Sequence, residues 1–299
     1  MKIAYITTYD LFDSASWPRN QLGMCQAAKR LASNLENYFP VAYVGGLKKK
    51  TFPITKLKWL FYRKVVGKDY YRWSEPTVAK DYTFQVEKKL NRISHDVVFC
   101  AENALIAPYL KTSKPIVMWT DAPLASLIDF YPYMSNLCKE TKNNILKLEK
   151  QAFLGSHKIL FASEWAAEFA LRTYGLNPDK VKVVPWGANL GPMPCKESIC
   201  QKVLTRPIRP LKLLFIGKEW NRKGGNQILE IAKLLNLKGI ETELIVIGCQ
   251  PQIKGSLPTF VKVLGYLDKS TTEGWNQIVK VMESTHFLLL LSQSEGHFE

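Results

Sequence analysis

Short apolar runs rich in β-branched and aromatic residues alternate along this chain with stretches of helical periodicity. This alternation constrains the fold strongly, because neighbouring parallel strands need a crossover helix and a sheet covered on both faces buries whole strands. Before residue 190 the strand-like runs are Lys2 to Thr7, Val41 to Gly45, Asp96 to Cys100, Pro115 to Trp119, Lys158 to Ala162 and Val181 to Pro185. Residues 1–190 therefore predict an α/β domain with a doubly wound, Rossmann-like sheet.

Helix signals fall between these runs. The stretch from Asn136 to Leu154 carries its apolar residues mainly on one side. Ser163 is a favourable N-cap for the next helix, which Tyr174 and Gly175 should end. The predicted strands and helices thus make up a complete first domain.

The strand-helix rhythm stops and then restarts. A stretch with Gly191, Pro192, Pro194, Pro207 and Pro210 lacks periodicity, so we interpret residues 191–210 as a linker. Strand-like runs follow at Leu211 to Gly217, Glu243 to Gly248, Phe260 to Leu264 and Phe287 to Leu291, with a helix from about Asn226 to Leu237. Residues 211–299 predict a second Rossmann-like domain, and we expect it to be C-terminally truncated because such domains usually need ~150 residues.

Charge and composition narrow the class of protein. A net charge of +15 favours phosphates, anionic headgroups or nucleic acid as partners, but no zinc finger, RNP pattern or helix-turn-helix supports nucleic acid. No run reaches the ~18 apolar residues of a membrane span, and the first strand is too short for a signal peptide, which predicts a cytoplasmic protein. The six cysteines are scattered, and no Asp-x-Asp or ligand cluster occurs, so we expect reduced thiols and neither metal nor cofactor.

The segment from Phe215 to Gly225 is the most informative one locally. It reads as a strand, a glycine-containing loop with Lys218, Arg222 and Lys223, and then a helix. Such a loop can aim free backbone N–H groups and the positive end of the helix dipole at an anion, which predicts a diphosphate site. The alternative is a solvated basic turn, because the spacing is neither a P-loop nor a G-x-G-x-x-G motif.

Several segments in a fixed order resemble the retaining GT-B glycosyltransferases of family 4. They are Lys2 to Thr7, Lys182 to Asn189, Phe215 to Gly225, Val263 to Leu267 and Leu291 to Gly296. The resemblance covers essentially the whole chain. It implies transfer of a sugar from a nucleotide-diphosphate sugar to a hydroxyl acceptor, either a glycan or a lipid-linked molecule, with retention of configuration.

The resemblance also implies roles for residues of the loop. Gly217, Lys218, Lys223 and Gly224 would grip the donor diphosphate. Lys218 stands where the family usually has arginine, which keeps the charge but loses bidentate geometry. Arg222 is therefore expected to share the task.

Two carboxylates are candidate catalytic residues. Glu295 matches the first of the family's paired glutamates, the second would fall beyond the end of the sequence, and the departure after Gly296 leaves Glu299 as an alternative first glutamate. Asp121 follows a predicted parallel strand, at the edge where open α/β sheets bind ligands, and the resemblance implies that it contacts the transferred sugar. A turn-capping role for Asp121 is the alternative.

Two basic segments allow further interpretations. The loop from Tyr9 to Gly23 carries Arg19, which either supplies charge to the donor site or lies on the surface. Residues 48–72 hold nine Lys or Arg and one Asp, interleaved with aromatic residues. This pattern suits an anionic membrane surface, and hence a peripheral location at the inner face of a membrane, or else a helix with inward aromatics and solvated lysines.

A non-catalytic class competes with the enzyme. The missing second glutamate and the +15 charge also fit a sugar-nucleotide or polyanion-binding protein, or an inactive fragment of a glycosyltransferase. The histidines at 95, 157, 286 and 297 are isolated, and we expect no catalytic role for them.

Overall fold

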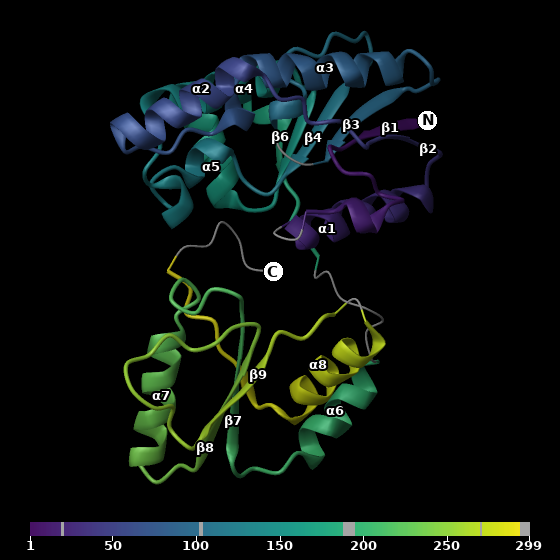
Figure 1. Ribbon diagram of the computed structural model, residues 1–299. Coiled ribbons are helices and arrows are strands. Elements are labelled where there is room, and N and C mark those ends of the chain that lie inside the picture. The colour runs from purple at the N-terminus through teal and green to yellow at the C-terminus, as the bar shows by residue number, and fades with distance from the viewer. Residues whose placement is uncertain (19–20, 102–103, 188–194, 270, 294–299) are drawn as a thin grey trace. The chain divides into compact units, whose positions relative to one another are not determined.

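In a computed structural model the chain forms two compact units, Met1–Asn189 and Leu190–Glu295 (Figure 1). The structure describes residues 1–18, 21–101, 104–187, 195–269 and 271–293. Each unit is built on a parallel sheet with helices against it. Two Rossmann-like α/β domains were predicted, and this fold class is confirmed.

The first unit contains a six-stranded parallel sheet of order β2-β1-β3-β4-β5-β6. Its strands are β1 (Ile3–Ile6), β2 (Val41–Val44), β3 (Val97–Ala101), β4 (Ile116–Thr120), β5 (Lys158–Phe161) and β6 (Val181–Val183). Its α-helices are α1 (Leu22–Glu36), α2 (Pro53–Phe61), α3 (Pro76–Leu90), α4 (Lys139–Gly155) and α5 (Glu164–Tyr174).

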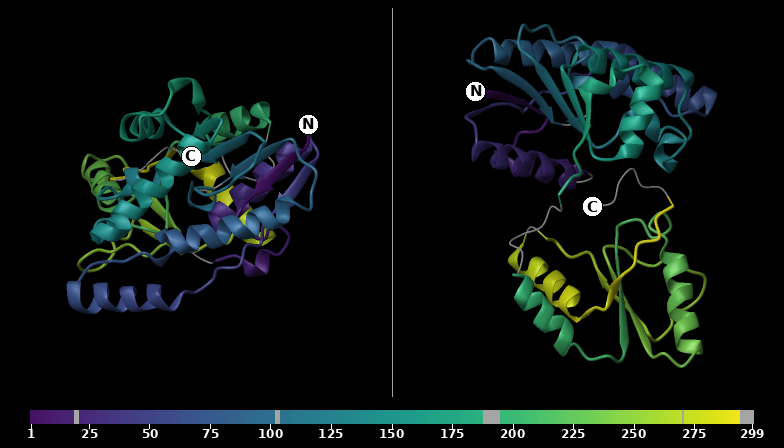
Figure 2. Two further views of the ribbon diagram at one scale, coloured as in Figure 1. Left: turned by 90° about the horizontal axis from the view of Figure 1, so that it is seen from above. Right: turned by 180° about the vertical axis from the view of Figure 1, so that it is seen from behind.

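Alternating residues of β1 show why this sheet is covered on both faces. Ile3 and Tyr5 pack with Ala28 of α1, whereas Ala4 and Ile6 belong to the cluster that includes α3 and α4. Figure 2 shows α1 on one side of the sheet and α3 on the other. Since successive strand side chains point to opposite faces, a wholly apolar strand requires this arrangement.

Helix α5 begins and ends as the sequence predicts. The hydroxyl of Ser163 accepts a hydrogen bond from the backbone N–H of Ala166 at 3.3 Å. Gly175 ends the helix with φ of 65°, in the left-handed region that favours glycine.

Replacement of the Ser163 cap should destabilise the first unit modestly. We expect Ser163→Ala to lower its free energy of unfolding by about 1 kcal/mol, because one N-terminal N–H loses its acceptor. Urea denaturation followed by circular dichroism measures this, with Ser163→Asp, which restores an acceptor, as the control. Equal stability of the alanine variant and the native chain would contradict the capping role.

The second unit contains a four-stranded parallel sheet of order β10-β7-β8-β9. The strands are β7 (Leu211–Ile216), β8 (Thr242–Ile247), β9 (Val261–Gly265) and β10 (Phe287–Leu288), and the helices are α6 (Lys196–Thr205), α7 (Gly225–Leu237) and α8 (Thr272–Ser284). Leu213 and Phe215 pack with Ile228 of α7, and Leu214 of the same strand packs in the cluster with Val281 of α8.

Two features of this unit differ from the sequence analysis. Helix α6 lies inside the stretch interpreted as a linker. It buries no residue, its apolar side chains Ile199, Val203 and Leu204 are exposed, and the ion pair of Lys202 with Glu283 attaches it to α8. Strand β10 is only two residues long and about half exposed, because it lies at the edge of the sheet.

Candidate functional site

The loop between β7 and α7 is tightly coiled. The N–H of Lys223 donates to Glu219 O at 3.0 Å, that of Gly224 to Asn221 O at 3.1 Å, and that of Gly225 to Trp220 O at 2.8 Å. These three groups are engaged within the loop. The prediction that the loop presents free N–H groups is therefore wrong for residues 223–225, since turn formation uses them.

Trp220 anchors the loop from beneath. Its side chain is buried, its ring centroid lies 5.1 Å from that of Phe215, and its Nε1 donates to Asn226 Oδ1 at 2.8 Å. A Cβ on Gly225 would lie 2.2 Å from the indole ring, so only glycine fits against it. The loop is thus fixed to the strand before it and the helix after it.

The three cations of the loop have different surroundings. Lys218 Nζ lies 5.3 Å from the ring centroid of Tyr266, a cation–π contact. Arg222 Nε lies 2.6 Å from Glu219 Oε2, so this carboxylate offsets part of the positive charge. The side chain of Lys223 passes over Gly217, where an added Cβ would lie 3.2 Å from Lys223 Cγ.

Sequence reasoning missed Glu219 and Tyr266 as neighbours of these cations. Glu219 stands three residues before Arg222, a spacing that often forms ion pairs and could have revealed it. Tyr266 follows β9 and gave no local signal.

Close backbone approaches bring neighbouring segments to this loop. A Cβ on Gly248, after β8, would lie 2.7 Å from Gly217 O, and one on Gly224 would lie 2.1 Å from Leu291 O. The N–H of Gln293 donates to Arg222 O at 2.8 Å. The segment after β10 therefore packs on the loop, at the carboxyl edge of the sheet, where open α/β sheets bind ligands.

Three residues considered in the sequence analysis, Arg19, Glu295 and Glu299, lie outside the described residues. Their roles stay predictions. Asp121 directly follows β4, and its carbonyl accepts a hydrogen bond from the N–H of Ala162 at 3.3 Å. Its position at the carboxyl end of the strand is as expected, and its role also stays a prediction.

The carboxyl edge of the first sheet carries a cavity of about 810 Å³. Residues that follow β1, β2, β3 and β4 line it, among them Thr8, Gly46, Leu105 and Leu124. Six aromatic side chains contribute to the wall: Tyr9, Trp17, Tyr71, Trp73, Tyr82 and Tyr133. Sequence analysis did not predict this cavity, because its walls come from loops that are far apart in the chain.

A buried carboxylate supports the loop after β4. Glu149 of α4 accepts hydrogen bonds from Leu124 N at 2.6 Å, Ala125 N at 3.0 Å and Tyr174 Oη at 2.7 Å. Burial raises the pKa of Glu149 to about 7, against the opposing effect of these donors. The sequence held a signal that we missed, since Glu149 lies on the same helix face as the buried Ile145 and Ala152.

Two features are absent from the residues that the structure describes, a cluster of metal ligands and a membrane-spanning helix. Within the described parts of the chain, no three His, Cys, Asp or Glu side chains are grouped to hold a metal ion. No helix in those same parts has the length and apolar character needed to cross a bilayer.

Comparison with known proteins identifies the fold and no more. No family model matches the chain, and no curated protein matches it in sequence. Among solved structures, WaaG, a glycosyltransferase involved in lipopolysaccharide biosynthesis, aligns with a TM-score of 0.57 at 16% identity, over 99% of this chain and 76% of WaaG. The N-terminal domain of Candida albicans trehalose-6-phosphate phosphatase aligns with a TM-score of 0.54 at 14% identity, over 99% and 78%. The chain thus has the fold of two Rossmann-like domains that the glycosyltransferase WaaG also has.

Proposed function

We propose that this protein is a retaining glycosyltransferase that moves a sugar from a nucleotide-diphosphate sugar to a hydroxyl acceptor. The observation that supports this most is the loop after β7. Lys218, Arg222 and Lys223 project from a loop fixed at the carboxyl edge of the second sheet, where the glycines at 224 and 248 allow close backbone approach. A fixed group of cations suits a diphosphate better than a mobile basic turn does.

In this proposal the loop cations stabilise the leaving diphosphate. The bond between the anomeric carbon and the diphosphate breaks while the bond to the acceptor oxygen forms, and the acceptor proton passes to a diphosphate oxygen on the same face. The chain then needs no metal and no separate base, because fixed positive charge offsets the developing negative charge. Glu295 would contact the donor and Asp121 the transferred sugar.

In this proposal the two domains bind different substrates. Residues 1–190 bind the acceptor and residues 211–299 bind the donor, joined by residues 191–210. The cavity of the first unit supports the acceptor assignment, because six aromatic side chains offer apolar faces to sugar rings or to an attached lipid.

The proposal is tested first through the donor. Thermal unfolding of the chain should shift upward with one of UDP, GDP or ADP, since a ligand bound to the native state stabilises it. In Lys223→Ala the affinity for that nucleotide should fall about tenfold or more, because a charged contact to phosphate is lost.

Lys233→Ala is the matched control. Lys233 lies on α7 and pairs with Glu230 of the same helix, away from the loop. It should bind the nucleotide as the native chain does. Equal loss of affinity in both variants, or none in Lys223→Ala, would contradict the assignment of Lys223.

A further inference from the structure

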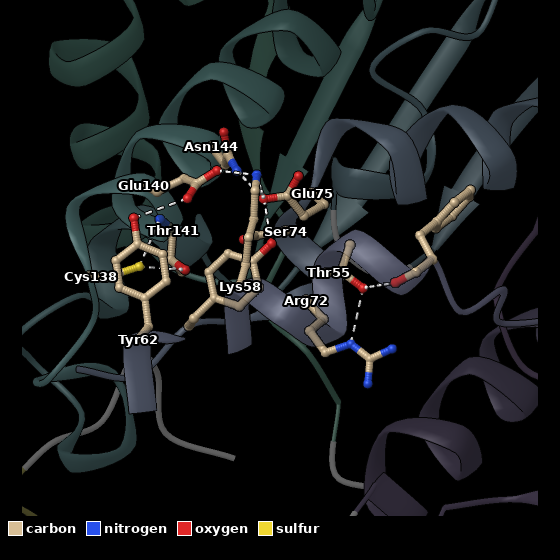
Figure 3. A network of polar contacts seen from close by, with 12 residues as sticks. Thr55, Lys58, Tyr62, Arg72, Ser74, Glu75, Cys138, Glu140, Thr141 and Asn144 are labelled. Atoms are coloured by element: carbon tan, nitrogen blue, oxygen red, sulfur yellow. Dashed lines mark hydrogen bonds and ion pairs between the residues drawn. The ribbon is translucent and has the colours of Figure 1, made fainter. Parts of the chain in front are cut away.

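Helix α2 and the π-helical turn η3 (Tyr62–Val66) turn a polar face toward the rest of the first unit (Figure 3). Thr55 is almost fully buried and accepts a hydrogen bond from Arg72 Nε at 3.2 Å. Lys58 Nζ lies 3.3 Å from Glu75 and also pairs with Glu140, which accepts a hydrogen bond from the Tyr62 hydroxyl at 3.1 Å. The inner face is thus held by ion pairs and hydrogen bonds.

The outer face of the same segment is apolar. Ile54 is 54% exposed, Leu57 62%, Phe61 53% and Val65 72%. Their spacing of three and four residues places them along one side of a helix. A helix on a globular protein normally shows the opposite arrangement, so α2 and η3 are amphipathic with the apolar side outward.

This differs from the two arrangements that the sequence left open for residues 48–72. Tyr62 and Tyr70 stack on each other at 5.4 Å, and Tyr70 is buried, as the inward-packing alternative expects. The apolar residues that face outward are mostly aliphatic, with Phe61 as the aromatic exception. Of the aromatic residues of the membrane hypothesis the outward face therefore keeps Phe61, and the rest of this face is aliphatic.

Every charged residue of this segment is basic. From Lys48 to Lys68 the sequence contains eight Lys or Arg and no Asp or Glu. Lys58 is the one turned into the network of Figure 3, and the seven others have exposed positions. Lys56 and Arg63, seven residues apart, share one side of the segment. Figures 1 and 2 place α2 at the outer margin of the first unit.

We propose that the outward face of α2 and η3 docks on the surface of an anionic lipid bilayer. The aliphatic side chains would enter the boundary between headgroups and acyl chains while the cations contact anionic headgroups. Apolar residues flanked by cations complement the surface of an anionic bilayer. A second copy of the same face would not fit, because its cations would repel the cations of this one. The inference goes beyond the transferase proposal and does not depend on it.

Co-sedimentation with vesicles tests the inference without any measurement of transfer. The protein should bind phosphatidylcholine vesicles that contain phosphatidylglycerol and bind pure phosphatidylcholine vesicles at least tenfold more weakly. Leu57→Asp should lower the partition constant about tenfold or more, since an exposed apolar anchor is lost. Lys56→Gln should lower it about fivefold, which corresponds to about 1 kcal/mol for one cation near an anionic surface.

Leu237→Asp is the control for the leucine variant, because Leu237 is 83% exposed on α7 of the other unit and should not affect binding. Thermal unfolding checks that each variant is folded. Binding that is equal for both kinds of vesicle, or unchanged in Leu57→Asp, would overturn the proposal. Self-association without vesicles that Leu57→Asp abolishes would also overturn it, in favour of a second copy.

Discussion

Replacement of Glu149 by alanine should lower the free energy of unfolding of the first unit by about 3–5 kcal/mol, because three hydrogen-bond donors lose their acceptor and each unpaired donor costs about 1–3 kcal/mol. Glu149 accepts hydrogen bonds from Leu124 N, Ala125 N and the Tyr174 hydroxyl. In Glu149→Ala all three donors, of which Ala125 N and the Tyr174 hydroxyl are buried, lose their acceptor, and a cavity replaces the side chain. Urea denaturation measures the loss, and a change below about 1 kcal/mol would contradict it, since one ordinary hydrogen bond has that effect.

The raised pKa of Glu149 also predicts that the free energy of unfolding depends on pH. Burial raises the pKa of Glu149 to about 7, above its ordinary value of 4.5, so the folded state binds its proton more tightly than the unfolded state does. The stabilisation is fully present below pH 4.5 and is lost as the pH rises toward 7. The unfolding free energy should therefore fall across this window by about 3 kcal/mol, at 1.36 kcal/mol per pKa unit.

Glu149→Gln isolates this contribution, because the amide keeps the volume of the side chain but does not titrate. The difference between native chain and variant should shrink or reverse as the pH rises from 4.5 to 7. Parallel stability curves for the two proteins across that window would show that another group is responsible.

The strands were predictable because their burial leaves a local trace. Lys158 to Ala162 and Leu211 to Gly217 are each apolar at most positions, and the observed β5 and β7 differ from these runs by one residue at an end. Helix α6 has a weaker trace, because its apolar residues, among them Ile199 and Val203, are few and exposed. Tertiary contacts between loops, such as the walls of the cavity in the first unit, leave no local trace.

Helix α2 shows a second limit of sequence reasoning. Periodicity reveals that a helix has two faces, and it is usual to assign the apolar one to the core. Here Thr55, Lys58 and Tyr62 face inward, because Glu75 and Glu140 on other elements offer partners to Lys58 and Tyr62. The orientation of the helix depends on partners that are distant in the sequence, so it could not be predicted from the sequence of the helix alone.

The loop after β7 could be predicted only in part from the sequence. Its cations and glycines are visible in the sequence, and their place at the carboxyl edge follows from the predicted strand. The pairing of Arg222 with Glu219 and the approach of Leu291 to Gly224 come from folding. Because Leu291 approaches Gly224 closely, a side chain at position 224 should have a large effect that mutation can measure.

Gly224→Ala should destabilise the second unit and weaken nucleotide binding tenfold or more, whereas Gly239→Ala should destabilise it less and leave nucleotide binding unchanged. The two glycines have almost equal φ, 76° and 77°, so a side chain costs both about 1–2 kcal/mol of backbone strain. A Cβ at 239 meets nothing within 4 Å, but at 224 it would lie 2.1 Å from Leu291 O. That contact is to backbone, so the loop or the segment after β10 must move, at a further cost of about 1–3 kcal/mol.

Because the displaced loop carries Lys223 and Arg222, the affinity of Gly224→Ala for the stabilising nucleotide should fall tenfold or more, while Gly239→Ala should bind as the native chain does. Denaturant unfolding gives the two stabilities, and thermal shift with the nucleotide gives the two affinities. The comparison separates strain from contact, since only the contact differs between the sites. If both variants lost the same stability and bound the nucleotide equally well, the packing of Leu291 on the loop would have no part in forming the donor site.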